Sequence, residues 1–325
     1  MKVLVCGGAG YIGGHTVWSL YDKGYDIVVF DNLSTGNLEY LPKNITFIKG
    51  DITNKKDLDE LFKKHDFDCI MDFAAKIVVP ESVIKPLEYF FNNTEGVRLL
   101  IEKVVEKNIK NFIFSSTAAV YGQIQSGICD ENSFLNPINP YGDSKLAAEK
   151  IIQSSAYAYK FNYAILRYFN VAGADSKLRC GLKSNNLSHI VPIMTNSMLN
   201  KSIFKIFGDD YNTKDKTCIR DYVHVSDVAL AHVKALEYLV NSNKSIIANL
   251  GSNDGFSVKQ VVDEGLKYHN FKYEYASRRA GDPDKLIASN KIAKEFLKWE
   301  PKISLKEMIK SDFSFRKKLK NTESK

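Results

Sequence analysis

The chain has 325 residues, of which 44% are hydrophobic and 26% are charged, with a formal net charge of +7. Such a chain can bury a large core without disulfides or metals, and its composition excludes fibrous and disordered classes. Charges break every apolar run within about ten positions, well short of the roughly 20 residues that cross a bilayer. We interpret the one dense basic run, Lys317 to Lys320, as a solvated tail, so no nucleic-acid partner is expected.

The five cysteines are widely separated and include no Cys-x-x-Cys pair. This pattern argues against a disulfide framework and against a zinc site, so we expect reduced thiols and no metal. The residues from Met1 to Cys6 run directly into an apolar strand, without a basic leader or a hydrophobic signal core. We therefore expect a soluble protein of the cytosol with no membrane partner.

The first 170 residues alternate short β-branched runs with longer stretches of helical period. This is the pattern of βαβ units around a parallel sheet. The predicted strands are Val3 to Cys6, Ile27 to Asp31, Thr46 to Lys49, Cys69 to Phe73, Asn111 to Ser115 and Tyr163 to Arg167. The predicted helices include Gly13 to Lys23, Lys55 to Lys64, Leu87 to Lys107 and Ser144 to Lys160. The series predicts an α/β fold with a large, doubly wound parallel sheet.

A glycine-rich turn follows the first predicted strand. The sequence GGAGYIG places Gly7, Gly10 and Gly13 at three-residue intervals, where the chain turns into a helix. Without Cβ atoms the backbone lets a pyrophosphate approach the amide groups at the positive end of that helix. The second strand ends at Asp31, whose carboxylate can accept hydrogen bonds from ribose hydroxyls. Because no arginine follows in residues 32–36, the motif predicts a Rossmann domain that binds NAD rather than NADP.

A tyrosine and a lysine, Tyr141 and Lys145, stand four positions apart and therefore share one face of a helix. A phenol is a poor base at neutral pH, but an adjacent ammonium favours the phenolate and lowers the pKa of the phenol. An isolated pair of this spacing is more often a surface tyrosine and a solvated lysine. Its position after the fifth strand of an NAD-binding domain favours a catalytic pair, and the hydroxyl of Thr117 at the end of that strand would lie beside the reacting group.

After about Gly173 the pattern loosens into loops rich in Asn, Ser, Asp and Lys. We expect residues 1–173 to form the NAD-binding domain and residues 174–325 to form a smaller, mixed α/β substrate-binding region. Some segments of the second region are expected to return to the first domain. The two parts should pack closely, with the ligand in the crevice at the carboxyl ends of the strands.

Taken together, these residues resemble the extended short-chain dehydrogenase/reductase family, and within it the UDP-glucose (UDP-galactose) 4-epimerases. The likeness runs nearly end to end. It is carried by GGAGYIG, Asp31-Asn32-Leu33-Ser34, Asp72-Phe73-Ala74-Ala75, Glu81-Ser82-Val83, Pro86-Leu87-Glu88-Tyr89, Phe112 to Thr117, Pro140-Tyr141-Gly142 with Ser144-Lys145, Arg167 to Asn170, Ile219 to Tyr222 with His224-Val225, and Arg278-Arg279 with Gly281-Asp282. The resemblance implies inversion at C4 of a UDP-hexose through a 4-keto intermediate, with bound NAD.

The glycine motif and the resemblance together imply a role for each matching residue. The catalytic set is Tyr141 as acid and base, Lys145 and Thr117. The cofactor set is Gly7, Gly10, Tyr11, Ile12, Gly13, Asp31, Asn32, Ser34, Thr35, Gly36, Asp51, Ile52, Phe73, Ala74, Ala75, Asn92, Ser115, Tyr141, Lys145 and Tyr168. The substrate set is Thr117, Tyr141, Asn170, Asn186, Leu187, Arg220, Arg279, Asp282 and Leu286. A guanidinium fork suits a diphosphate on electrostatic grounds, which independently supports the two arginines.

Other functions remain open on the same scaffold. A sugar-nucleotide 4,6-dehydratase needs an acid and a base directly after the threonine, where Ala118 and Ala119 stand, and neither can move a proton. A 4-reductase or a decarboxylase would show net turnover of the coenzyme. A non-catalytic NAD-binding sensor is the remaining alternative, but it has no need of Tyr141, Lys145 and Thr117.

The resemblance carries two further implications. Leu286, four positions after Asp282, stands where a bulky tyrosine in some members excludes N-acetylated sugars, so we expect UDP-N-acetylglucosamine and UDP-N-acetylgalactosamine to be accepted as well. Members are usually homodimers, and the predicted helices Leu87 to Lys107 and Ser144 to Lys160 would pair across such an interface.

Overall fold

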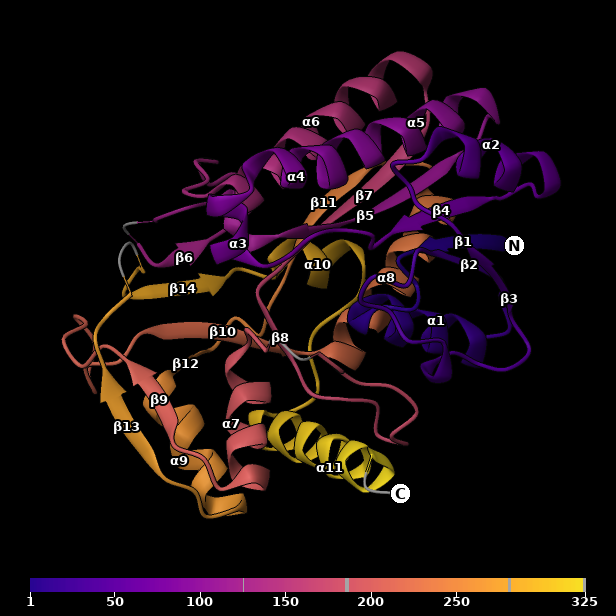
Figure 1. Cartoon of the computed structure of the whole chain (residues 1–325). Coiled ribbons are helices and arrows are strands. Elements are labelled where there is room, and N and C mark those ends of the chain that lie inside the picture. Colours follow the sequence, from indigo (N-terminus) through magenta and orange to yellow (C-terminus); the bar gives the residue numbers. More distant parts are fainter. Residues whose placement is uncertain (125, 185–186, 280–281, 324–325) are drawn as a thin grey trace.

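The computed structural model describes residues 1–124, 126–184, 187–279 and 282–323 (Figure 1). Its larger part is a sheet of seven parallel strands in the order β11-β7-β5-β4-β1-β2-β3. The strands are β1 (Lys2–Cys6), β2 (Asp26–Asp31), β3 (Thr46–Lys49), β4 (Cys69–Asp72), β5 (Asn111–Thr117), β7 (Asn162–Tyr168) and β11 (Ile246–Leu250). The predicted parallel α/β sheet is confirmed, and each of the six predicted strands ends within two residues of the observed one.

The seventh strand, β11, was not among the predicted strands. It comes from the second half of the chain and adds to the edge of the sheet beside β7. No local feature of a short apolar run specifies which strand it pairs with. Only the path of the chain through the second region brings this strand back to the sheet.

Helices cover both faces of the sheet, as a doubly wound fold requires (Figure 1). One face carries α1 (Tyr11–Asp22), α8 (Val225–Ser242) and α10 (Lys291–Phe296), and the other carries α2 (Lys55–Lys64), α5 (Gly96–Glu106) and α6 (Pro140–Tyr159). Strand residues alternate between the two cores: Val3 and Val5 join the first, whereas Leu4 and Cys6 join the second. This period of two, with apolar residues on both faces, is why β1 reads as a continuous hydrophobic run.

The predicted helix from Leu87 to Lys107 is interrupted. It consists of α4 (Pro86–Phe90), a π-helical turn (Phe91–Glu95) and α5, and it follows the short α3 (Val79–Ile84). Helix α6 begins four residues earlier than predicted, with Pro140 at its first position and the Asn139 side chain accepting a hydrogen bond from Gly142 N (2.9 Å). This start places Tyr141 in the first turn of α6.

The smaller part is built on β10 (Ile219–His224), which pairs with β8 (Asn170–Ala172), β12 (Gly255–Ser257) and β14 (Lys285–Ala288). Strand β14 also pairs with β6 (Ile128–Cys129), and β9 (Phe204–Phe207) pairs with β13 (Tyr273–Ala276). A third core joins α7 (Ile190–Asn200), α9 (Val258–Tyr268) and α11 (Leu305–Glu323). Because β8 follows β7 almost directly, the second part starts at the carboxyl edge of the large sheet.

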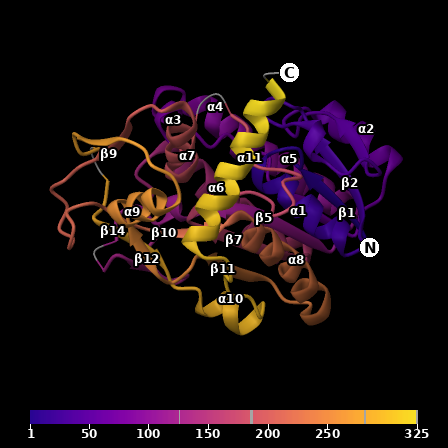
Figure 2. The same cartoon turned by 90° about the horizontal axis from the view of Figure 1, so that it is seen from below.

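The lysines of the basic run Lys317 to Lys320 are exposed, as expected, but the run is helical and is not a loose tail. It lies in α11, which crosses the molecule in Figure 2. Lys318 Nζ donates to the carbonyl of Leu178 (2.8 Å), and Lys320 Nζ donates to the carbonyl of Leu199 (3.2 Å). These cations cap backbone acceptors of neighbouring segments, which explains their density without an anionic partner.

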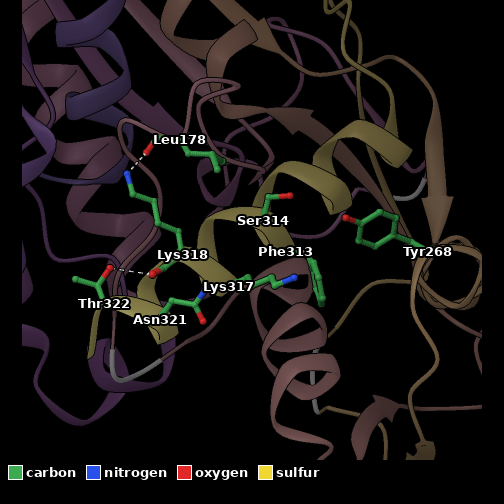
Figure 3. A pocket seen from close by; sticks show the side chains of 8 residues that line it. All are labelled: Leu178, Tyr268, Phe313, Ser314, Lys317, Lys318, Asn321 and Thr322. Atoms are coloured by element: carbon green, nitrogen blue, oxygen red, sulfur yellow. Dashed lines mark hydrogen bonds between the residues drawn. The ribbon is translucent and has the colours of Figure 1, made fainter. Parts of the chain in front are cut away.

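An open cavity of about 650 Å³ lies along the same helix (Figure 3). It is lined by Leu178, Tyr268, Phe313, Ser314, Lys317, Lys318, Asn321 and Thr322. None of these eight residues belongs to the predicted catalytic, cofactor or substrate sets.

The five cysteines are all buried free thiols. Among the described residues, no cluster of histidine, cysteine and carboxylate side chains has the makings of a metal site. Across the same parts of the chain, no helix combines the length and the apolar character that a bilayer crossing demands.

Candidate active site

The glycine turn closes tightly between β1 and α1. Gly7 has a φ of +69°, and a Cβ atom there would lie 2.6 Å from Ala74 N. A Cβ atom on Gly13 would overlap the carbonyl oxygen of Gly7. Gly10 is the N-cap residue of α1, so no side chain caps the first amides of this helix. The sequence therefore builds a cradle of bare backbone at the positive end of α1.

Asp31 ends β2 beside this cradle. Its Oδ2 accepts a hydrogen bond from Ala9 N (2.9 Å), and its Oδ1 accepts one from Leu33 N (2.7 Å). Burial raises the pKa of Asp31, while these two hydrogen bonds oppose the rise. The next segment folds back over the turn, because Asn37 N donates to Ala9 O (2.9 Å) and Gly36 packs against Ala9. The structure thus brings together Asp31, the glycine turn and the predicted residues 32–36.

The remaining predicted cofactor residues of this half follow β3 and β4, at the same edge of the sheet. Asp51 accepts hydrogen bonds from Asn32 Nδ2 (2.8 Å) and from Thr53; burial alone would raise its pKa, but these bonds lower it. Ile52 is buried, and the ring of Phe73 lies 4.7 Å from that of His232. Parallel strands end at one edge, so residues distant in sequence meet there as predicted.

The three predicted catalytic residues gather at the ends of β5 and α6. The Thr117 hydroxyl lies close enough to the Tyr141 phenol to lower its pKa by hydrogen bonding, and Thr117 Oγ1 accepts a hydrogen bond from Ala119 N (3.1 Å). Lys145 lies one turn further along α6 and is 2% exposed. Its ammonium lies 4.0 Å from the ring centroid of Phe114 on β5.

The pKa values of this pair differ from the sequence expectation. Burial raises the pKa of Tyr141, and the hydrogen bond with Thr117 opposes the rise. Burial lowers the pKa of Lys145 to about 8, while the charges of Asp72 and Glu149 raise it. The expected lowering of the tyrosine pKa by Lys145 is therefore not found in this structure: desolvation of the phenol is the largest influence, and Lys145 is not among the groups that shift this pKa.

Further residues that were predicted to bind the cofactor lie on β5, on β7 and in the π-helical turn. The hydroxyls of Ser115 on β5 and Tyr168 on β7 are hydrogen-bonded to each other. Asn92, in the π-helical turn, accepts a hydrogen bond from Lys76 N (3.0 Å). Such single-turn π-helical insertions often mark functional sites.

Sequence reasoning missed Asn93, the next residue. It is buried, its Oδ1 accepts from Lys76 N (2.8 Å), and its Nδ2 donates to Ser144 Oγ (3.0 Å). Ser144 stands between Tyr141 and Lys145, so Asn93 anchors the helix that carries both. The only sequence signal was a second asparagine inside a helical stretch, where asparagine is intrinsically unfavourable.

On the opposite wall, Arg220 of β10 and Asp282 are brought together. Arg220 Nη2 donates to Asp282 Oδ1 (2.6 Å) and to the carbonyl of Pro283 (2.7 Å). Tyr211 also donates to Asp282 through its hydroxyl (3.0 Å). Arg279 is exposed, with its guanidinium 4.2 Å from the ring centroid of Phe207. A guanidinium stacked in this way keeps its edge free to bind an anion.

The predicted gatekeeper, Leu286, pairs with Arg220 in the register of β14 and β10. It also packs against a small core that includes Ala118, Val120 and Tyr121, directly after Thr117. Leu286 therefore connects the strand that carries Arg220 with the segment that directly follows Thr117.

Three further residues complete the predicted substrate set. Asn170 Nδ2 donates to the carbonyl of Asp221 (3.1 Å), and Leu187 is half-buried. Asn186 lies outside the described residues.

Comparisons with known proteins agree with this geometry. Residues 3–251 match the model of the NAD dependent epimerase/dehydratase family. A UDP-glucose 4-epimerase from Halalkalibacterium halodurans is 44% identical over 321 residues, covering 98% of this chain and 96% of the relative. A crystal structure of UDP-glucose 4-epimerase from Brucella ovis in complex with NAD matches with a TM-score of 0.91 at 38% identity, over 95% of this chain and 96% of that one.

A third match is the UDP-Glc/GlcNAc 4-epimerase from Campylobacter jejuni, with a TM-score of 0.86 at 41% identity. It covers 98% of this chain and 99% of the neighbour. Both the identity and the coverage are high, and the alignment spans the sheet and the smaller part alike. The chain therefore belongs to the NAD-dependent epimerase/dehydratase family and, within it, to the UDP-glucose 4-epimerases.

Proposed function

We propose that this protein interconverts UDP-glucose and UDP-galactose by inverting C4 of the hexose through a 4-keto intermediate. The observation that carries the proposal is the meeting of Thr117, at the end of β5, with Tyr141, in the first turn of α6: the Thr117 side chain lowers the pKa of the phenol, and Lys145 is buried one turn away. Family membership at 44% identity supports the same reaction. The large sheet with its carboxyl edge serves the cofactor, and most of residues 174–325 serve the UDP-sugar.

The residues present fit NAD. A Cβ atom on Gly7 or Gly13 would overlap backbone atoms, and one on Gly10 would lie 3.2 Å from Gly7 O, so bare backbone is left to approach a pyrophosphate there. Asp31 lies beside it with lone pairs left on both oxygens, and its negative charge disfavours a 2′-phosphate. NAD held by these residues would supply a reversible acceptor for the hydride of the sugar C4.

Tyr141 moves the proton. As phenolate it takes the proton of the 4-hydroxyl, and as phenol it gives the proton back once the keto sugar has turned over. Thr117 holds the sugar oxygen beside the phenol through its hydroxyl, which also lowers the pKa of Tyr141. Lys145 supplies the positive charge that favours the phenolate when the reacting groups are in place. Ala118 and Ala119 offer no second acid or base, which disfavours the dehydratase alternative.

A firmly held nucleotide and a loosely held hexose are what this reaction needs. Arg220 and Arg279 hold the diphosphate, while Asp282, Asn170, Asn186 and Leu187 complete the UDP site. The hexose meets few polar groups and is free to present either face of C4. Leu286 borders the space beside Thr117 and is smaller than a tyrosine. We therefore extend the proposal to UDP-N-acetylglucosamine and UDP-N-acetylgalactosamine.

We also propose a homodimer of the cytosol. Several large apolar side chains on α3, α4 and the π-helical turn are strongly exposed: Val83 (62%), Ile84 (80%), Leu87 (82%) and Phe91 (57%). An exposed apolar patch of this kind is typical of a protein interface. The five buried free thiols suit a reducing compartment.

The proposal is tested by mixing the purified protein with UDP-glucose, without added coenzyme, and following product stereochemistry by NMR. UDP-galactose should accumulate to an equilibrium mixture, and the absorbance of reduced nicotinamide should show no net change. Net coenzyme turnover would instead indicate a reductase or a decarboxylase. A protein that binds NAD but leaves UDP-glucose unchanged would be the non-catalytic sensor.

A further inference from the structure

Two buried carboxylates act on the ammonium of Lys145. Asp72 lies at the end of β4, and Glu149 lies one turn beyond Lys145 on α6. Asp72 is 1% exposed and Glu149 is fully buried. Both charges raise the pKa of Lys145 against the opposite effect of burial. The hydrogen-bond partners of the two carboxylates differ, and this difference decides which of them supplies the counter-charge.

Glu149 is already neutralised by another cation. Its Oε1 accepts from Arg167 Nε (3.0 Å) and from Ser116 Oγ, and its Oε2 accepts from Arg167 Nη2 (2.6 Å). This bidentate pair is 2% and 0% exposed at its two side chains. A carboxylate held in this way has little charge left for a third group.

The carboxylate of Asp72, in contrast to that of Glu149, is not fully satisfied by hydrogen bonds. Its Oδ1 accepts one hydrogen bond from Ala74 N (3.0 Å), and its Oδ2 is buried without a hydrogen-bond partner among the described residues. In the sheet register Asp72 is the partner of Phe114, the residue whose ring carries the Lys145 ammonium. An unsatisfied buried carboxylate oxygen is costly unless a cation compensates it.

We propose that Asp72 is a positioning residue for the reaction: it is the counter-charge that keeps buried Lys145 protonated beside Tyr141. The catalytic consequence rests on the proposed function, whereas the pairing of Asp72 with Lys145 does not. The charge of Lys145 in turn makes the buried carboxylate of Asp72 tolerable.

The other titratable groups near Asp72 do not replace this role. Cys6, its neighbour on β1, carries a thiol whose pKa burial and the nearby carboxylates raise, so the thiol stays neutral. Burial also raises the pKa of Tyr168, and that phenol stays neutral as well. The pKa of Asp72 itself is raised to about 6 by burial, and Lys145 limits this rise. With Lys145 at about 8, both groups are charged in the window between these two values.

The direct test is an NMR titration of the Lys145 side chain in the variant Asp72→Asn, with lysine ¹³Cε labelling and assignment through Lys145→Arg. Asparagine keeps the acceptor for Ala74 N and removes only the charge. The pKa of Lys145 should fall by about one unit or more, because burial then acts unopposed by Asp72. The alkaline limb of kcat/KM should move to lower pH by the same amount.

Asp312→Asn is the matched control. Asp312 is also fully buried with one unpartnered carboxylate oxygen, but it pairs with Arg316 on α11. Its variant should leave the titration of Lys145 unchanged. A second arm does not depend on the folding of Asp72→Asn: in Lys145→Met, ¹³Cγ NMR should show that the pKa of Asp72 rises.

An unchanged titration of Lys145 in folded Asp72→Asn, or an unchanged titration of Asp72 in Lys145→Met, would overturn the pairing. Neither measurement requires epimerase activity. If the two variants show the expected shifts but the wild-type protein has no turnover, the proposed function fails and this inference stands.

Discussion

The candidate site has a catalytic wall, formed by Thr117, Tyr141 and Lys145, and a recognition wall, formed by Arg220, Arg279 and Asp282, and the two are built differently. Thr117, Tyr141 and Lys145 stand on β5 and α6, within the core of the sheet, and Lys145 is almost fully buried. Arg220 and Asp282 meet through a side-chain ion pair of 2.6 Å at the edge of the smaller part, and Arg279 is exposed. The chemistry is thus fixed by regular backbone, whereas recognition depends on long side chains and connecting segments.

Breaking the catalytic wall should have the largest effect. Tyr141→Phe removes the proton carrier but keeps the ring, so kcat should fall by about 10³-fold. Purified protein should retain its NAD, measured by absorbance after denaturation, because the glycine cradle is untouched. Substantial residual turnover would refute the role of Tyr141.

The variant Glu149→Gln tests the buried ion pair between Glu149, on the same helix as Tyr141 and Lys145, and Arg167. A neutral glutamine leaves the Arg167 guanidinium buried without its charge partner, and the free energy of unfolding should fall by about 3–5 kcal/mol. Urea unfolding followed by circular dichroism measures the change. Glu102→Gln breaks an ion pair with Arg98 at a side chain that is 48% exposed, so it should cost less than about 1 kcal/mol. Equal losses in the two variants would show that burial of the pair does not matter.

The recognition wall is tested by Arg220→Ala. Loss of the diphosphate contact should lower kcat/KM by about 10²-fold, mainly through KM, and should weaken UDP binding in calorimetry. Arg278→Ala is the matched control, because Arg278 donates to the carbonyl oxygen of Asp282 (2.9 Å) and stacks on Tyr211 without being in the predicted substrate set. If both variants lose affinity equally, the assignment of Arg220 to the diphosphate fails.

The smallest effect is expected where the two walls meet. Leu286→Tyr should lower the turnover of UDP-N-acetylglucosamine relative to UDP-glucose by about tenfold, because the larger side chain fills the space beside Thr117. Leu286→Met, of nearly equal volume, should leave the ratio unchanged. A tyrosine variant with undiminished N-acetyl turnover would count against the gatekeeper role. Competition between the two substrates in one reaction gives this ratio directly.

The difference between the two walls also explains which of their residues could be predicted from the sequence. On the catalytic wall, short local patterns fixed the positions of Gly7, Asp31, Thr117 and Tyr141, because strand ends and helix starts are local events. The pKa of Tyr141 was mispredicted, since it depends on how much solvent the folded chain excludes. On the recognition wall, the sequence implied Arg220 through resemblance and the fit of a guanidinium to a diphosphate, and Asp282 through resemblance only. Their pairing could not be predicted, because 62 positions separate them and no local pattern joins them.

The sequence by itself determined the parallel α/β fold, the glycine cradle and the four-residue spacing of Tyr141 and Lys145, because periodicity and backbone freedom are properties of neighbouring residues. The tertiary structure alone decided that β11 completes the sheet and that Asn93 anchors the catalytic helix. It also decided that Glu149 is paired with Arg167, whereas Asp72 keeps a buried carboxylate oxygen without a hydrogen-bond partner among the described residues. Burial and charge pairing are set by segments that meet only after the chain has folded, so no stretch of sequence contains them.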